Sequence, residues 1–190
     1  MGMKYRRNNF YVITGGPGVG KTTLLNELEN AGYRTIEEDA RQIIKEQIKN
    51  KGNGLPWGNR ELYTDLMISA SLQSYEAVSD VRDEIVFFDR GIIDAFCYAR
   101  MIQLPVTSEM KNIITNYLYN PQVFILPPWP EIYRTDGERK QTWEEAAETY
   151  DVMRSTYIDY GYTPIDVPPD TPQARANFIL RNIIQSDFQQ

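Results

Sequence analysis

The sequence predicts an α/β fold in which helices cover both faces of a parallel sheet. Short β-forming runs alternate with longer stretches of helical pattern along the 190 residues. The runs are almost continuously apolar, as in the letters IVFF before Asp89, and such strands are typical of parallel sheets buried on both faces. The alternation also fits, because parallel strands need helical crossover connections. We expect a single domain over residues 1–190, which is long enough for a sizeable core.

Each expected element of the first half has a local signal in the sequence. The apolar run 10–14 is a strand that ends in a glycine-rich turn, and the helix 21–30 ends before Gly32. A short strand at 33–36 and a helix at 39–48 follow. Glycine and proline mark 51–58 as a loop. A long helix at 60–78 then leads to the buried strand 85–88.

The second half continues the alternation. Helices are expected at 92–101 and 108–118, and a strand at 123–126 ends before Pro127. Thr142 and Glu145 match a capping box at the start of a helix that runs to about Asp159. A last strand is expected at 162–167, and Pro172 occupies the first position of a C-terminal helix. The fold expected in full is therefore a sheet of five parallel strands with a helical lid at about 130–145.

Composition excludes several classes of protein. The chain is 42% hydrophobic and 24% charged, which is ordinary for a soluble globular protein. Its net charge of −6 disfavours non-specific binding to nucleic acid or anionic membrane. One cysteine and no histidine exclude intrachain disulfides, cysteine zinc clusters and histidine-based catalysis. With no signal peptide or transmembrane run, we expect a cytoplasmic protein without nucleic-acid or membrane partners.

Residues 15–22, with the sequence GGPGVGKT, fit the phosphate-loop pattern GxxxxGK[ST] between a strand and a helix. The glycines let backbone N–H groups surround phosphate oxygens at a helix N-terminus. Lys21 would neutralise phosphate charge, and Thr22 would bind Mg²⁺. The expected cofactors are ATP, by default over GTP, and Mg²⁺. The expected nucleotide-binding residues are Gly15, Gly16, Pro17, Gly18, Val19, Gly20, Lys21, Thr22 and Thr23.

Asp89 ends a buried strand and is followed by Arg90, where many hydrolytic ATPases carry a second acid. Asp89 can hold Mg²⁺ through water. Arg90 cannot activate water, because it stays protonated, but it can bind a phosphate or a planar polar acceptor with two parallel hydrogen bonds. The pair therefore favours a kinase, in which the bound acceptor supplies the nucleophile. The alternative is that Arg90 forms a structural salt bridge.

Acidic side chains also follow the second strand. Glu37, Glu38 and Asp39 would lie at the carboxyl edge of the sheet, where ligands of such folds bind. Glu38 is the candidate base that accepts the proton of an acceptor hydroxyl. Alternatively, these acids stabilise the first turn of a helix.

Two further features carry weaker signals. Arg134 and Arg139 lie in a basic segment that can close over the phosphates and stabilise the transferring group, or can form a solvated face. Trp57 can stack on an acceptor ring, but we favour a role in anchoring its loop on the core. Tyr157 belongs to a helical series of aromatic residues that predicts core packing.

Taken in order, the motifs GGPGVGKTT, E-x-x-R (Glu38 and Arg41), DRG-x-x-D (Asp89 to Asp94), ILPPW and IYRTDGERKQ resemble a family along the whole chain. It is the P-loop family of AAA-type ATPase/kinases, similar to the ribosylnicotinamide kinase half of the bacterial NAD-biosynthesis regulator. Thymidylate and deoxynucleoside kinases are more distantly similar. The resemblance implies that the Asp89 strand lies beside the phosphate-loop strand, and that Glu38, Arg41, Arg90 and Asp94 face the acceptor.

The function expected from these observations is Mg²⁺- and ATP-dependent phosphoryl transfer to a small hydroxyl- or phosphate-bearing acceptor, with nucleoside- or nucleotide-like molecules as candidates. The alternative is a nucleotide-dependent switch or ATPase that acts through a partner. A closed pocket between Glu38, Arg90 and the Trp57 loop would favour the kinase, whereas an open surface would favour the switch.

Overall fold

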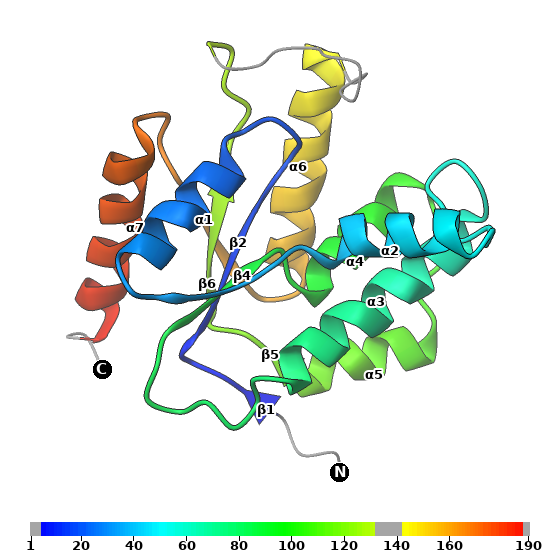
Figure 1. Cartoon of the computed structure of the whole chain (residues 1–190), viewed down its shortest axis with the longest axis horizontal. Helices are drawn as coiled ribbons and strands as arrows, with labels where there is room; N and C mark the ends of the chain where they lie inside the picture. The colour runs from blue at the N-terminus through cyan, green and yellow to red at the C-terminus, as the bar shows by residue number, and fades with distance from the viewer. Residues whose placement is uncertain (1–4, 132–141, 188–190) are drawn as a thin grey trace.

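A parallel sheet of five strands forms the centre of the computed structural model, which describes residues 5–131 and 142–187 (Figure 1). The strand order is β3-β4-β2-β6-β7, and each neighbouring pair is parallel. The five strands are β2 (Phe10–Gly15), β3 (Arg34–Ile36), β4 (Val86–Asp89), β6 (Gln122–Leu126) and β7 (Thr163–Asp166). The predicted α/β class and the predicted place of the Asp89 strand, beside the phosphate-loop strand, are confirmed.

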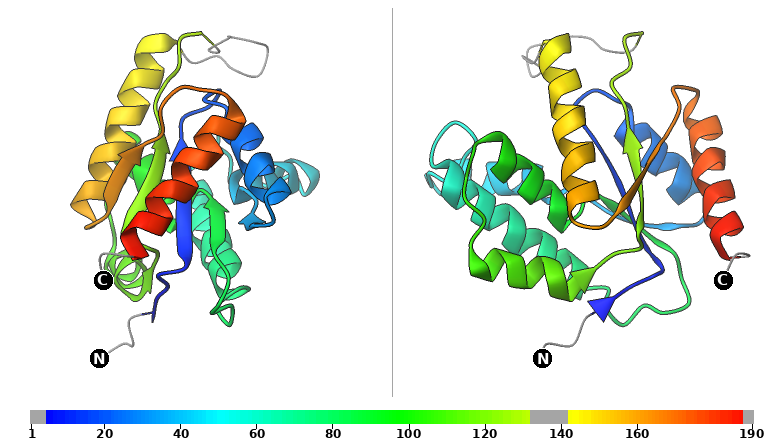
Figure 2. Two further views of the ribbon diagram at one scale, coloured as in Figure 1. Left: turned by 90° about the vertical axis from the view of Figure 1, so that its left-hand side faces the viewer. Right: turned by 180° about the vertical axis from the view of Figure 1, so that it is seen from behind.

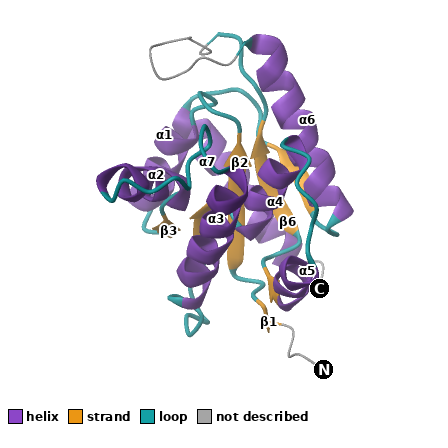
Figure 3. Cartoon of the chain, turned by 90° about the vertical axis from the view of Figure 1, so that its right-hand side faces the viewer, coloured by secondary structure: helices purple, strands orange, loops and turns teal. Residues whose placement is uncertain are grey.

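Helices cover both faces of this sheet, as Figure 2 shows. The helices are α1 (Lys21–Asn30), α2 (Asp39–Lys49), α3 (Arg60–Glu76), α4 (Ile92–Met101), α5 (Ser108–Asn116), α6 (Trp143–Asp159) and α7 (Pro172–Asp187). Alternate residues of β2 point to opposite faces: Tyr11 and Ile13 pack with α1 and α7, and Phe10 and Val12 pack with α3 to α6. Figure 3 shows α3 and α4 in front of the strands.

A small second sheet was not predicted. Strand β1 (Tyr5–Arg6) pairs in parallel with β5 (Tyr117–Leu118). The prediction that the helix of residues 108–118 continues to Leu118 is therefore wrong, because Tyr117 has an extended backbone with φ −108 and ψ 94. The carbonyl of Leu118 accepts hydrogen bonds from the Arg7 N–H and the Tyr75 hydroxyl. These tertiary partners outweigh the local helical pattern.

The carboxyl ends of β2, β3 and β4 share one edge of the sheet, so the segments that follow these strands meet there. Helix α2 begins at this edge and packs against α3, where the Ser74 hydroxyl donates to Asp39 Oδ1 at 2.9 Å. Most of the predicted lid segment, with Arg134 and Arg139, lies outside the described residues. Within the described ranges, no helix is both long and apolar enough to cross a membrane.

Candidate functional site

The phosphate loop connects β2 to α1 by a path that depends on glycine. Gly18 and Gly20 have φ of 79° and 78°, in the left-handed region that favours glycine. A Cβ on Gly15 would lie 2.8 Å from the Leu126 carbonyl oxygen. Gly20 offers no side chain to cap α1, so the first N–H groups of this helix are available to an anion. The Thr23 hydroxyl donates to the Gly20 carbonyl at 2.9 Å.

A cleft of about 500 Å³ lies against this loop. Residues 16–23 form one wall, and Glu38, Arg41 and Arg90 form the other. Such a cleft is large enough for a small ligand. The predicted phosphate-loop residues and three of the predicted acceptor residues are thus brought together.

Lys21 lies between two carboxylates at the base of this cleft. Its Nζ contacts Asp89 Oδ1 at the end of β4, and it lies 3.7 Å from Glu38 Oε2. The ammonium group is largely buried, and the two carboxylates offset the cost of burying its charge. These contacts place a P-loop lysine, a strand acid and a candidate base in one cluster.

Arg90 extends the cluster toward the acceptor side. Its Nε donates to Glu38 Oε1 at 2.7 Å, and its Nη1 lies 3.3 Å from Asp94 Oδ1. The structural salt bridge considered as the alternative for Arg90 is therefore present. Arg41 Nε lies 4.0 Å from Glu38 Oε2, and this side chain is 77% exposed. Arg41 can consequently reach a ligand without breaking a strong contact.

The pKa values of Glu38 and Asp89 are shifted in opposite directions. Burial raises the pKa of Glu38, but the attraction of Arg90, Lys21 and Arg41 outweighs burial, and the pKa is lowered overall. Burial also raises the pKa of Asp89, and here Lys21 offsets only part of the effect. Glu38 is therefore ionised at neutral pH and can accept a proton.

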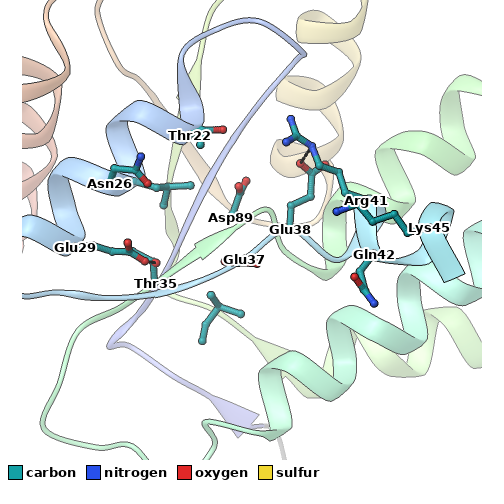
Figure 4. A pocket seen from close by; sticks show the side chains of 12 residues that line it. Thr22, Asn26, Glu29, Thr35, Glu37, Glu38, Arg41, Gln42, Lys45 and Asp89 are labelled. Atoms are coloured by element: carbon teal, nitrogen blue, oxygen red, sulfur yellow. Dashed lines mark hydrogen bonds and ion pairs between the residues drawn. The ribbon is translucent and has the colours of Figure 1, made fainter. Parts of the chain in front are cut away.

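A second cleft of about 300 Å³ joins the first through Thr22, Glu38 and Arg41. Figure 4 shows Thr22 and Asp89 toward α1, and Arg41 and Lys45 on α2 across from them. The Thr22 hydroxyl and the Asp89 carboxylate are hard oxygen donors that fit Mg²⁺. No cluster of three or more acidic, cysteine or histidine ligands occurs in the described residues. In sites of this kind, Mg²⁺ commonly takes its other ligands from phosphate oxygens and water.

Asp94 lies behind Arg90 and is only 9% exposed. Its carboxylate accepts hydrogen bonds from Thr14, Arg90, Gly91 and Tyr157. The resemblance implies that Asp94 faces the acceptor, but in the structure its carboxylate is enclosed by these donors.

Trp57 lies in the loop between α2 and α3 and is 68% exposed. The prediction that it anchors this loop on the core is therefore wrong. It is not among the described residues that line the phosphate-loop cleft. A single tryptophan in a loop has no periodic neighbours from which its burial can be predicted.

Arg175 in α7 is a site residue that sequence reasoning missed. Its Nη1 donates to the Val19 carbonyl of the phosphate loop at 2.8 Å, and its guanidinium lies 5.7 Å from the centre of the Trp129 ring. It is only 3% exposed, and burial lowers its pKa. No sequence motif identifies Arg175, because its contact with Val19 joins residues 156 positions apart and leaves no local pattern.

Comparisons with known proteins agree with the fold described above. A family model described as an AAA domain matches residues 10–175, and no curated protein matches the sequence. The structure is similar to the NadR protein in complex with NR, with a TM-score of 0.65 and 18% identity over 95% of this chain and 50% of that chain. The chain thus spans half the length of that protein.

Two complete kinases are also similar. Thymidylate kinase from Ehrlichia chaffeensis has a TM-score of 0.59 and 15% identity over 93% of this chain and 98% of that chain. Shikimate kinase from Aquifex aeolicus has a TM-score of 0.52 and 13% identity over 95% of this chain and 99% of that chain. At these identities the likeness establishes the fold, which is that of the P-loop kinases.

Proposed function

We propose that this chain, which belongs to a family of AAA domains, is an ATP- and Mg²⁺-dependent phosphotransferase acting on a small-molecule acceptor. The observation that carries the proposal is the contact of Arg90 with Glu38 beside Lys21 and Asp89. This arrangement provides a base and a phosphate-binding cation, but no second acid directly after Asp89. The kinase folds found among solved structures support it.

The nucleotide would be held by the phosphate loop. Backbone N–H groups of residues 15–23 and the N-terminus of α1 bind phosphate oxygens. Lys21 moves from Asp89 and Glu38 to the β- and γ-phosphates. Thr22 and Asp89 hold Mg²⁺, which neutralises charge on the phosphate oxygens when it is bound.

Glu38 would act as the general base. Its carboxylate accepts the proton of the acceptor hydroxyl while that oxygen bonds to the γ-phosphorus and the bond to the β-phosphate oxygen breaks, releasing ADP. Once Lys21 engages the phosphates, one cation that lowers the pKa of Glu38 is withdrawn, and Glu38 becomes a stronger base. Arg41 and Arg90 would orient the acceptor. For Arg134 and Arg139, closure over the phosphates as lid residues stays a prediction.

The acceptor would be small and polar, of the nucleoside or nucleotide class. The 500 Å³ cleft is lined by charged side chains and phosphate-loop backbone. The similar structures are a NadR protein in complex with NR, a thymidylate kinase and a shikimate kinase, whose names indicate small ligands. The exposed guanidinium of Arg41 suits an acceptor with an anionic or hydroxyl group.

Mass spectrometry of metabolite mixtures incubated with the protein and Mg·ATP tests the proposal. We expect one or more small molecules to gain the mass of a phosphoryl group. In Lys21→Ala we expect the rate to fall about 100-fold or more, because the phosphates lose their principal cation. Lys111→Ala, at an exposed position of α5, is the matched control and should retain activity.

Two outcomes would overturn this proposal. Retained activity in Lys21→Ala would remove the assignment of the phosphate loop. Equal release of γ-phosphate with and without a broad panel of nucleosides, nucleotides and sugars would instead support the ATPase or switch.

A further inference from the structure

Asp94 is a buried carboxylate whose oxygens are already occupied by donors. Oδ1 accepts from the Thr14 hydroxyl at 2.5 Å and from Arg90 Nη1 at 3.3 Å. Oδ2 accepts from the Gly91 N–H at 2.8 Å and from the Tyr157 hydroxyl at 2.5 Å. A carboxylate offers about four lone-pair sites, so these donors leave none for a ligand.

The four donors come from separate parts of the fold. Thr14 is the residue of β2 that precedes Gly15, Arg90 and Gly91 connect β4 to α4, and Tyr157 lies on α6. Thr14 and Tyr157 are fully buried. In such a setting, hydrogen bonds to a charged acceptor are short and strong. Asp94 therefore links the strand of the phosphate loop to two helices on one face of the sheet.

Arg90 depends on this link for its orientation. It is not a glycine, yet its φ is 70°, in the left-handed region that such residues seldom adopt. Glu38 holds Nε and Asp94 holds Nη1, so two carboxylates fix the plane of the guanidinium. Arg90 is nevertheless 24% exposed and lines the phosphate-loop cleft, where its guanidinium can bind a ligand.

We propose that Asp94 is a positioning residue, which together with Thr14 and Tyr157 holds Arg90 in the orientation that binds the acceptor or the transferring phosphoryl group. Asp94 itself does not contact the acceptor. This differs from the acceptor-facing role that the sequence resemblance implies. The inference rests on the proposed function only for the role of Arg90, which is to bind the acceptor or the transferring phosphoryl group.

Kinetics of Asp94→Asn and Tyr157→Phe test this role. Asp94→Asn keeps the shape of the side chain but removes its charge and one acceptor. We expect acceptor turnover to fall about 10- to 100-fold through misplacement of Arg90. Affinity for Mg·ATP should change far less, because Lys21 and Thr22 do not contact Asp94. Tyr157→Phe should cause a smaller loss in the same direction. Asp159→Asn, in an exposed pair with Arg100, is the control and should cause none.

A double-mutant cycle separates positioning from direct contact. If Asp94 acts through Arg90, Asp94→Asn should have little further effect in an Arg90→Ala background. Additive losses would overturn the inference. Should Asp94→Asn fail to fold, the same cycle with Tyr157→Phe decides the question.

An NMR measurement of Arg90 tests the positioning role without substrate, and so independently of the proposed function. The Arg90 Nε–H resonance, assigned with Arg90→Lys, should shift or broaden in both Asp94→Asn and Tyr157→Phe without any substrate. An unchanged resonance in both variants would refute the positioning role. A changed resonance in a protein that phosphorylates nothing would support the role and refute the kinase.

Discussion

At the scale of single residues, Glu38 is the carboxylate that interacts with three basic side chains of the site. It lies within ion-pair distance of Lys21, Arg41 and Arg90, which come from α1, α2 and the turn after β4. Their combined attraction overcomes the burial of the carboxylate and lowers its pKa below 4.5. Glu38 therefore contributes to the stability of the fold as well as to the proposed chemistry.

The stability contributed by Glu38 should depend on pH. A folded-state pKa below 4.5 means that the contribution is complete above this pH and is lost as pH falls through the folded pKa. At neutral pH we expect Glu38→Gln to lower the free energy of unfolding by about 1 to 3 kcal/mol. The difference from wild type should shrink progressively below pH 4.5. Urea unfolding across this range measures it.

Glu148→Gln is the control for this measurement, since Glu148 is an exposed glutamate on α6. Its effect on the free energy of unfolding should be small at each pH. A difference between Glu38→Gln and wild type that stayed constant down to about pH 3 would show that the ion pairs contribute nothing to stability.

Sequence reasoning could bring Lys21, Glu38, Asp89 and Arg90 together because each follows a strand of one parallel sheet. The carboxyl ends of such strands necessarily share an edge. The partners of Asp94 could not be predicted in this way. Tyr157 was expected to pack in the core, and it does, but its hydroxyl meets a carboxylate 63 residues away. Periodicity predicts which face is buried and does not predict which polar atoms meet there.

At the scale of elements, α7 contacts the phosphate loop through a hydrogen bond. Its Arg175 is a buried cation with no ion pair in the described residues, and it donates to the Val19 carbonyl. A buried charge without an acid is unfavourable for stability, so its presence indicates a role in the loop. The start of α7 at Pro172 was predicted from the sequence, but this contact was not.

The substitution Arg175→Met should affect the stability of the fold and the affinity for Mg·ATP differently. We expect the free energy of unfolding to change by less than about 1 kcal/mol or to rise, because an unpaired buried charge is removed. Affinity for Mg·ATP should fall about tenfold as the Val19 carbonyl loses its donor. Isothermal titration calorimetry and urea unfolding measure the two quantities.

Arg181→Met, at an exposed position of the same helix, is the matched control and should change neither quantity. Unchanged nucleotide affinity in Arg175→Met would show that the phosphate loop keeps its geometry without α7.

At the scale of the whole molecule, the order β3-β4-β2-β6-β7 places the phosphate-loop strand at the centre of the sheet. Local patterns predicted where strands and helices lie, but not this order, which was implied in part by the family resemblance. The two-residue strands β1 and β5 were missed because so short a pair has no periodicity of its own. The central position of β2 connects the nucleotide site to both faces of the core.

Because of this connection, nucleotide binding should stabilise the whole fold. A ligand that binds only the folded state at about 100 times its Kd adds about 2.7 kcal/mol to the free energy of unfolding. For a chain of this size, that is a rise in Tm of about 5 to 10 °C. We expect this rise with a non-hydrolysable ATP analogue and Mg²⁺, and a smaller one when EDTA removes the Mg²⁺ that we propose Thr22 and Asp89 hold. Lys21→Ala should abolish most of it, whereas Lys111→Ala should retain it. An equal rise in Lys21→Ala would mean that the nucleotide binds elsewhere on the molecule.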